Sequence, residues 1–246
     1  MTRQRFRRAV LVISSVLIPI TLFYLSPYVI LMAASEGIVS GSCIVFGGLL
    51  VSSLVLGRAF CGWVCPAGGI GEFASRLRDK QKRYRRANGI KYGIWLPWLG
   101  LIAYFSASAG GLRKVQFGYQ TWHGISVSSW NGLVILLVIL LLLVGLSVIV
   151  GRRGFCHTMC WMAPFMILGR TIRDRMRFVG LRLTGDAEAC IECGQCTRHC
   201  PMSLDVQAMV ARGAMSDSEC ILCANCADTC PKDAIGLRFT RADPHQ

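Results

Sequence analysis

The feature that most constrains this chain is a cysteine pattern that occurs twice near its C-terminal end. Residues 190–201 read CIECGQCTRHCP and residues 220–231 read CILCANCADTCP, so both follow C-x-x-C-x-x-C-x-x-x-C-P at a shift of 30 positions. Three closely spaced thiolates and a distant fourth hold a cubane 4Fe–4S cluster, and in two-cluster proteins the fourth ligand comes from the other copy. The expected ligand sets are Cys190, Cys193, Cys196 and Cys230 for the first cluster, and Cys220, Cys223, Cys226 and Cys200 for the second.

This pattern predicts a small α+β ferredoxin domain of the bacterial two-cluster type, which accepts and passes single electrons. A pair of zinc sites would not explain why each copy closes with C-x-x-x-C-P. Disulfides are disfavoured in a reducing cytoplasm. The tail also has no glycine-rich dinucleotide fingerprint, so we expect no substrate site of its own there.

The rest of the chain has the composition of a membrane protein. Apolar residues make up 53% of the sequence and charged residues only 16%, which is too apolar for an ordinary soluble domain. Residues 1–185 carry 22 Lys and Arg with four acids, whereas residues 186–246 carry five with nine acids. We therefore expect a membrane domain over residues 1–180 and an acidic cytoplasmic ferredoxin domain over residues 181–246, and no nucleic-acid partner.

Four apolar runs approach the length of about 20 residues that crosses a bilayer, near residues 9–31, 38–56, 90–109 and 130–150. They predict an all-α membrane domain, a bundle of four transmembrane helices. The first run follows four arginines but is long and contains two prolines, so we interpret it as a retained anchor and not as a signal peptide.

The basic residues predict the orientation of these spans. The N-terminus, residues 57–91 and residues 151–182 are rich in Lys and Arg, and the intervening loops are not. Basic loops remain on the cytoplasmic side. The sequence thus predicts a multi-pass protein of the cytoplasmic (inner) membrane with its N-terminus and its ferredoxin domain in the cytoplasm.

Two further cysteine motifs follow the second and fourth apolar runs. Residues 60–65 read FCGWVC and residues 155–160 read FCHTMC, and a shift of 95 positions superimposes them. The membrane domain therefore consists of two pseudo-repeated two-span units, which we expect to be related by an axis along the membrane normal. If each pair lies one turn apart on a helix face, the axis brings four thiols together at the cytoplasmic end. These are Cys61, Cys65, Cys156 and Cys160.

Three interpretations of these four thiols remain open. They suit a third metal or iron–sulfur centre, a dithiol redox couple, or simply buried small side chains. Arg58 and Arg153 precede the two motifs at equivalent positions. They either stabilise an anionic thiolate centre or only follow the positive-inside rule. Cys43 has no repeat partner, and we interpret it as a packing residue.

Together, GRAFCGWVCPAGG, FCHTMCWMAP and the double ferredoxin motif resemble the membrane polyferredoxin family over nearly the whole chain. Its members include membrane ferredoxin subunits of periplasmic nitrate reductase systems, electron donors to nitrous oxide reductase and a copper-linked oxidase-assembly protein. The resemblance implies electron transfer between the quinone pool, or a cytoplasmic donor, and a redox partner protein. Cys61, Cys65 and Pro66 match the C-x-x-x-C-P of the family, whereas Trp161 replaces the proline in the second copy.

The sequence as a whole predicts a membrane-bound iron–sulfur electron carrier or a subunit of an oxidoreductase, with quinol as one possible donor. His123, in the aromatic loop before the fourth run, is a candidate proton acceptor for a quinol headgroup. Two alternatives remain: a copper reductase or cofactor-assembly factor that uses the four-thiol centre, and a non-catalytic redox sensor or anchor subunit. No catalytic residue of a separate enzyme is recognisable.

Overall fold

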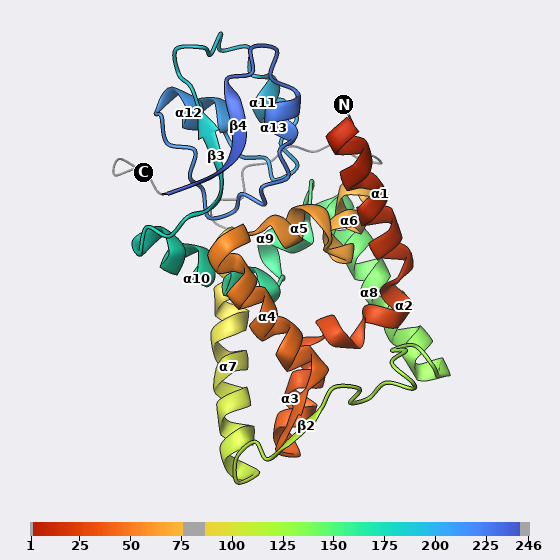
Figure 1. Ribbon diagram of the computed structural model, residues 1–246. Coiled ribbons are helices and arrows are strands. Elements are labelled where there is room, and N and C mark those ends of the chain that lie inside the picture. Colours follow the sequence, from red (N-terminus) through yellow and green to blue (C-terminus); the bar gives the residue numbers. More distant parts are fainter. Residues whose placement is uncertain (1, 76–86, 242–246) are drawn as a thin grey trace.

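The computed structural model describes residues 2–75 and 87–241. The basic run in residues 76–86 therefore lies outside the described residues. Figure 1 shows a helical N-terminal part with a small mixed tail packed against one end of it. The described helices of the N-terminal part are α1 (Thr2–Val16), α2 (Ile18–Thr21), α3 (Pro27–Ser35), α4 (Gly41–Leu56), α5 (Ala59–Trp63), α6 (Pro66–Ala74), α7 (Ile90–Ser108), α8 (Trp130–Ile149), α9 (Gly154–Thr158) and α10 (Met162–Arg175). At the opposite end, the parallel strands β1 (Ile38–Ser40) and β2 (Lys114–Gln116) pair with each other.

The third and fourth predicted runs form the continuous helices α7 and α8, but the first run does not form one continuous helix. Helix α1 ends at Val16, Pro19 lies in the short α2, and Pro27 is the first residue of α3. Proline lacks the N–H that a helix interior needs and is favoured at a helix start, so the chain breaks at both prolines. The run near residues 9–31, whose two prolines the sequence analysis noted, is thus divided among several short helices, and its crossing of the membrane stays a prediction.

Within the described residues, α8 is the one helix that is long and apolar enough to cross a membrane, and α4 is a shorter apolar helix. Helix α4 has 16 residues because the first three residues of the predicted run form β1. Helix α7 has 19 residues, but Lys91 and Pro97 lie within it. The structure thus shows a mostly helical protein, and the four-helix transmembrane bundle stays a prediction.

The two halves of the N-terminal part are interlocked. Helix α4 packs on α10, and helix α8 packs on α6, so the long helix before each cysteine motif contacts the helix that follows the other motif. Small residues allow the close approach at both crossings. Gly169 lies against Ser53, and Gly71 lies against Ser147.

The tail contains the antiparallel strands β3 (Gly180–Gly185) and β4 (Ile235–Thr240), with Gly180 opposite Thr240 and Gly185 opposite Ile235. Its helices are α11 (Gln195–Arg198), α12 (Val206–Ala211) and α13 (Asn225–Asp228). The two cysteine copies have the same backbone, since left-handed φ angles recur at a shift of 30. They occur at Glu192 and Leu222, Gly194 and Ala224, and Ser203 and Asp233.

We expect Gly169→Ala to destabilise the crossing of α4 and α10. An added Cβ would overlap the Ser53 hydroxyl and the Leu50 carbonyl oxygen, and such overpacking costs about 1–3 kcal/mol. The thermal unfolding midpoint in detergent would fall. Gly145→Ala in α8 is the matched control, since nothing lies within 4 Å of its new methyl group. Equal midpoints for the two variants would contradict this packing.

Candidate iron–sulfur sites

Each predicted tail quartet lines a hollow of its own. Cys190, Cys193, Cys196 and Cys230 line the first tail hollow. Cys200, Cys220, Cys223 and Cys226 line the second tail hollow. The two hollows are of similar size, as expected of two copies of one unit. In both, three thiols come from one copy and the fourth from the other.

Local backbone chemistry explains how each loop wraps its hollow. The third cysteine of each triplet lies in a short helix, Cys196 in α11 and Cys226 in α13. The residue before each helix, Gly194 or Ala224, has a left-handed φ angle that turns the chain back on itself. Glycine adopts this conformation easily, whereas alanine does so at a cost. All thirteen cysteines are free thiols, so both quartets are available to iron.

Cys65 and Cys160 lie outside the helices α5 and α9 that contain Cys61 and Cys156, which corrects one expectation. Helix α5 ends at Trp63, and Cys65 caps the next helix. The Cys65 N–H donates to the Phe60 carbonyl at 2.9 Å, and the Cys160 N–H donates to the Phe155 carbonyl at 3.1 Å. The prediction that each pair lies one turn apart on a helix face was wrong, because both motifs end one helix and start another. Both copies make the same turn, although Trp161 follows Cys160.

The four thiols of the two motifs, here called the helical quartet, are buried and close to one another. Burial raises the pKa of Cys65 well above its usual value, and the neighbouring thiols Cys61, Cys156 and Cys160 raise it further. Burial, followed by Cys156 and Cys61, raises the pKa of Cys160 to about 12. Metal ligation needs thiolates, so loading this site would release protons.

The spacing of the quartet bears on what it could hold. Across residues 2–75 and 87–241, no group of three or more His, Cys, Asp or Glu side chains is placed to hold a single metal ion. A cubane cluster is larger than one ion and lies between its four thiolates. Four thiolates are the donor set of such a cluster, so the quartet suits one.

Two buried arginines accompany the helical quartet at equivalent positions of the repeat. Arg58 and Arg153 are each only 1% exposed. The Nε atom of each is buried without a hydrogen-bond partner, and both side chains interact electrostatically with thiols of the quartet. A cluster bound by four thiolates is anionic and its sulfurs accept hydrogen bonds. The positive-inside rule does not explain why both arginines are buried. Their burial beside the thiols favours a role in stabilising an anionic centre.

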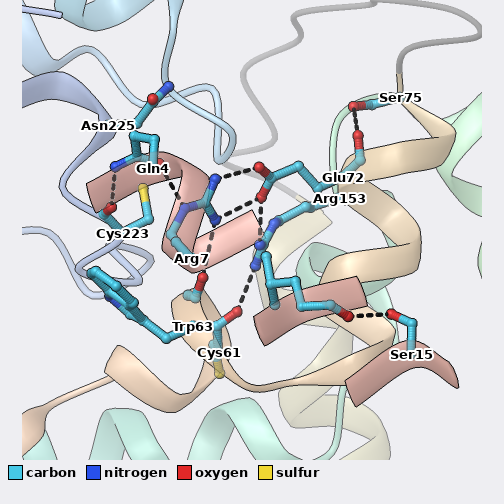
Figure 2. A network of polar contacts seen from close by, with 12 residues as sticks. Gln4, Arg7, Ser15, Cys61, Trp63, Glu72, Ser75, Arg153, Cys223 and Asn225 are labelled. Atoms are coloured by element: carbon cyan, nitrogen blue, oxygen red, sulfur yellow. Dashed lines mark hydrogen bonds and ion pairs between the residues drawn. The ribbon is translucent and has the colours of Figure 1, made fainter. Parts of the chain in front are cut away.

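Carboxylates hold these arginines in place, and the sequence analysis missed them. Figure 2 shows Arg7 and Arg153 converging on Glu72, with Arg153 2.8 Å from the carboxylate and 2.7 Å from the Cys61 carbonyl oxygen. Burial alone would raise the pKa of Glu72, but Arg153 and Arg7 outweigh it and lower the pKa to about 2. The available signal was that Glu72 is one of four acids in residues 1–185.

The second tail hollow lies against the helical quartet. The backbone of Gly62, inside the first motif, contacts the backbone of Ile221 and Cys223. The Trp63 indole N–H donates to the Leu222 carbonyl at 3.0 Å, and the Gln4 side chain donates to the Cys223 carbonyl at 3.0 Å. The same cysteine loop thus lines the second tail hollow and touches the first motif.

Ion pairs surround this contact. Arg58 lies 2.9 Å from Glu219, Lys91 pairs with the same carboxylate, and Arg3 pairs with Asp228. The acidic tail thus meets basic residues of the N-terminal part.

His123 is exposed in the loop after β2. Its ring packs edge-on against Trp122.

Comparison with known proteins connects both thiol regions to one chemistry. The family described as "4Fe-4S binding domain" matches residues 41–84 and again residues 132–176, which contain the two motifs of the helical quartet. The family described as "4Fe-4S dicluster domain" matches residues 182–236. These matches, together with the thiol-lined hollows, define an iron–sulfur electron-transfer protein.

Similar proteins extend over most of the chain. An uncharacterized protein of Methanocaldococcus jannaschii is 28% identical over 78% of this chain and 76% of its own length. The putative electron transport protein YccM of Escherichia coli is 26% identical, over 79% of this chain and 54% of its own length. The ferredoxin-type protein NapH of Haemophilus influenzae is 28% identical, over 72% and 61%. No solved structure matches this chain.

The homologues of this chain are ferredoxin-type electron transport proteins with 4Fe–4S domains, which agrees with the polyferredoxin resemblance of its sequence. The role of the chain is iron–sulfur electron transfer, as the sequence analysis predicted.

We expect Glu72→Gln to lower the stability of the protein and to weaken its dependence on acid pH. A carboxyl with a pKa lowered to about 2 stabilises the fold fully above about pH 4.5, and this contribution, about 3 kcal/mol, is lost as the pH falls toward 2. Unfolding midpoints measured between pH 7 and pH 3 should therefore fall less steeply in the variant.

Glu36→Gln is the control for this prediction, because Glu36 is exposed and accepts one hydrogen bond from Tyr119. If Glu72→Gln and Glu36→Gln gave the same pH profile, the buried cluster of Glu72, Arg7 and Arg153 would not contribute as described.

Proposed function

We propose that this protein passes single electrons along three 4Fe–4S centres. The first would be held by Cys190, Cys193, Cys196 and Cys230, the second by Cys220, Cys223, Cys226 and Cys200, and the third by the helical quartet Cys61, Cys65, Cys156 and Cys160. When bound, each cluster supplies a one-electron redox couple. The observation that carries the proposal is the backbone contact of Gly62 with Ile221 and Cys223, which makes the second centre the neighbour of the third.

The exposure of the thiols supports an order for the three centres. Cys193 is exposed and Cys190 is half-buried, whereas Cys220 and Cys223 are buried. Helices α11 and α13 pack against each other, and the Asn225 side chain donates to the His199 carbonyl at 2.6 Å. The first centre thus faces solvent, the second is internal, and the third lies deepest in the helical part.

Three observations support a cluster in the helical quartet. Both copies of the motif fall inside matches to a 4Fe–4S binding domain. The thiols are not placed around a single ion. Arg58 and Arg153 supply buried positive charge with unpaired N–H groups beside the quartet. Charge and hydrogen bonds of this kind stabilise an anionic cluster and raise its reduction potential.

We also propose that residues 1–180 form a membrane domain with four spans and that residues 181–246 form a cytoplasmic ferredoxin domain. Large apolar side chains are exposed along the outer helices, and such surface needs lipid or protein to cover it. Examples on α1, α4, α7 and α8 are Ile13, Val16, Val51, Val55, Leu96, Leu101, Leu137 and Leu141.

Quinol from the bilayer is the donor that we favour. An open, largely apolar hollow lies beside the first motif, and its lining includes Tyr24, Phe60, Val64 and Pro66. The hydroxyl of Ser14 is also part of this lining. A ring with polar substituents fits such a surface, and Phe60 and Val64 flank the quartet in sequence. This hollow also reaches the loop that contains His123, because Phe117 belongs to its lining and the Tyr24 hydroxyl donates to the Gly124 carbonyl at 3.4 Å.

One observation favours the second candidate function, reduction of copper. The Met166 sulfur lies 3.5 Å from the Cys61 sulfur, and thiolates with thioethers are soft ligands that suit Cu(I). Oxidation of the anaerobically reduced protein by Cu(II), lost in Met166→Leu, would support this role. Normal oxidation of Met166→Leu by copper would remove the argument.

We expect about 12 irons per chain in anaerobically purified protein, and about eight after Cys61, Cys65, Cys156 and Cys160 are changed to serine together, because each cubane contains four. Iron and acid-labile sulfide assays measure both values. Cys43→Ser is the control and should keep the full count. About eight irons in all three proteins would leave no third cluster.

We expect Gly62→Ala to slow electron transfer between the second and third centres while iron content stays unchanged. The added methyl group would overlap the Ile221 carbonyl oxygen and push the two loops apart, at about 1–3 kcal/mol. Flash reduction of the tail clusters, followed by their reoxidation, measures the rate. Gly93→Ala has open space around it and should transfer electrons normally, so a normal rate in Gly62→Ala would contradict the path.

A further inference from the structure

The two cysteine loops of the tail have the same backbone but opposite surroundings. Ile221 is 2% exposed, and its repeat partner Ile191 is 56% exposed. Leu222 and Cys223 are buried, whereas Glu192 and Cys193 are exposed. The same surface is therefore covered in the second copy and open in the first.

What covers the second loop is a redox site with a basic rim. At the centre, Gly62 and Trp63 of the first motif lie on the backbone of Ile221 and Leu222. Around this apolar centre, basic side chains of the N-terminal part contact carboxylates and carbonyls of the tail. They are Arg3 with Asp228, Arg58 and Lys91 with Glu219, and Arg170 with the Asp217 carbonyl.

The first loop is built in the same way, with acidic residues around an apolar centre. Ile191 and the Cys193 thiol are exposed at the middle. Four exposed acids lie in the first loop and its approach, residues 186–192, or directly after Cys230. Two exposed bases lie in α11 and directly after Cys230. The acids are Asp186, Glu188, Glu192 and Asp233, and the bases are Arg198 and Lys232. A surface of this composition attracts a basic partner.

We propose that this surface, here called the first loop face and defined by Ile191, Glu192, Cys193 and the acids around them, is the docking site for a separate redox protein. The partner presents an exposed redox centre on an apolar patch with a basic rim, as the N-terminal part does to the second loop. One electron passes between the partner and the first centre; the donor is oxidised, the acceptor is reduced, and no bond or proton is transferred. This inference rests on the proposed function of the tail as a carrier.

The test uses the full-length protein in detergent, reduced anaerobically, with a basic c-type cytochrome as the electron-accepting probe. The bimolecular rate should be high at low salt and fall as ionic strength rises. Glu188→Gln with Glu192→Gln should lower the low-salt rate by roughly threefold to tenfold and flatten its salt dependence.

The control pair, Phe239→Lys with Glu36→Gln, changes the net charge by the same amount. Phe239 is exposed four residues beyond Ile235 on β4, and Glu36 lies in the N-terminal part. This pair should leave the rate close to that of the unchanged protein. If the rate fell equally in both pairs of variants, only the net charge would matter, and the proposal would be overturned. An unchanged rate in both pairs would overturn it as well.

The apolar centre has its own test. Ile191→Ser should lower the rate even at high salt, where charge steering is screened, and should weaken binding of the cytochrome measured by titration. Since Ile191 is exposed, the fold should not change. Unchanged binding and rate would overturn the proposal. Two other results would also overturn the proposal. If the protein formed a dimer that Ile191→Ser dissociates, a second copy would be the occupant of the face. If the protein bound lipid vesicles through Ile191, the occupant would be a membrane.

Failure of this inference differs from failure of the proposed function. Iron content and the magnetic resonance spectrum of the reduced clusters report the proposed function in every variant. Normal clusters with unaltered cytochrome kinetics in the face variants would remove the docking site only. Purified protein without iron would remove the carrier, and cytochrome binding would still report on the face.

Discussion

Buried charge compensation is the constraint on which this structure depends. A guanidinium in a low-dielectric interior is costly unless an anion pairs with it, and Arg58 and Arg153 are both fully buried. Each has one carboxylate partner, Glu219 or Glu72, on one side and the helical quartet on the other. The carboxylate partner of Arg58 comes from the tail, so the pairing that stabilises the thiol site also fixes the tail to the helices.

The sequence predicted the parts of the fold that repeat. A shift of 30 identified both tail quartets, and a shift of 95 identified the helical quartet, because repeated spacing is visible without coordinates. Pro19 and Pro27 were noted in the first apolar run, and the helices of the structure are divided at both of them. The parallel pairing of β1 with β2 was not predictable, since it joins segments more than 70 positions apart.

The thiol site was also predictable only in the parts that repeat in the sequence. Sequence spacing gave the thiols, but the residues that surround them come from distant segments with no motif. Gln4, Arg7 and Lys91 reach the thiol loops only through the tertiary fold. The turn at Cys160 shows a further limit, because it equals the turn at Cys65 although no proline follows it. There, packing against the other half determines the backbone, and local propensity does not.

The interlocked packing of the two halves has a consequence for biosynthesis. Helix α4 packs extensively on α10, and helix α6 packs on α8 as well as on α1, so the first half lacks part of its partner surface while the chain is still being made. The other two thiols of the helical quartet, Cys156 and Cys160, lie about 100 positions downstream of Cys61 and Cys65. In the proposed three-centre arrangement, the third cluster can therefore be inserted only after translation has passed the second half.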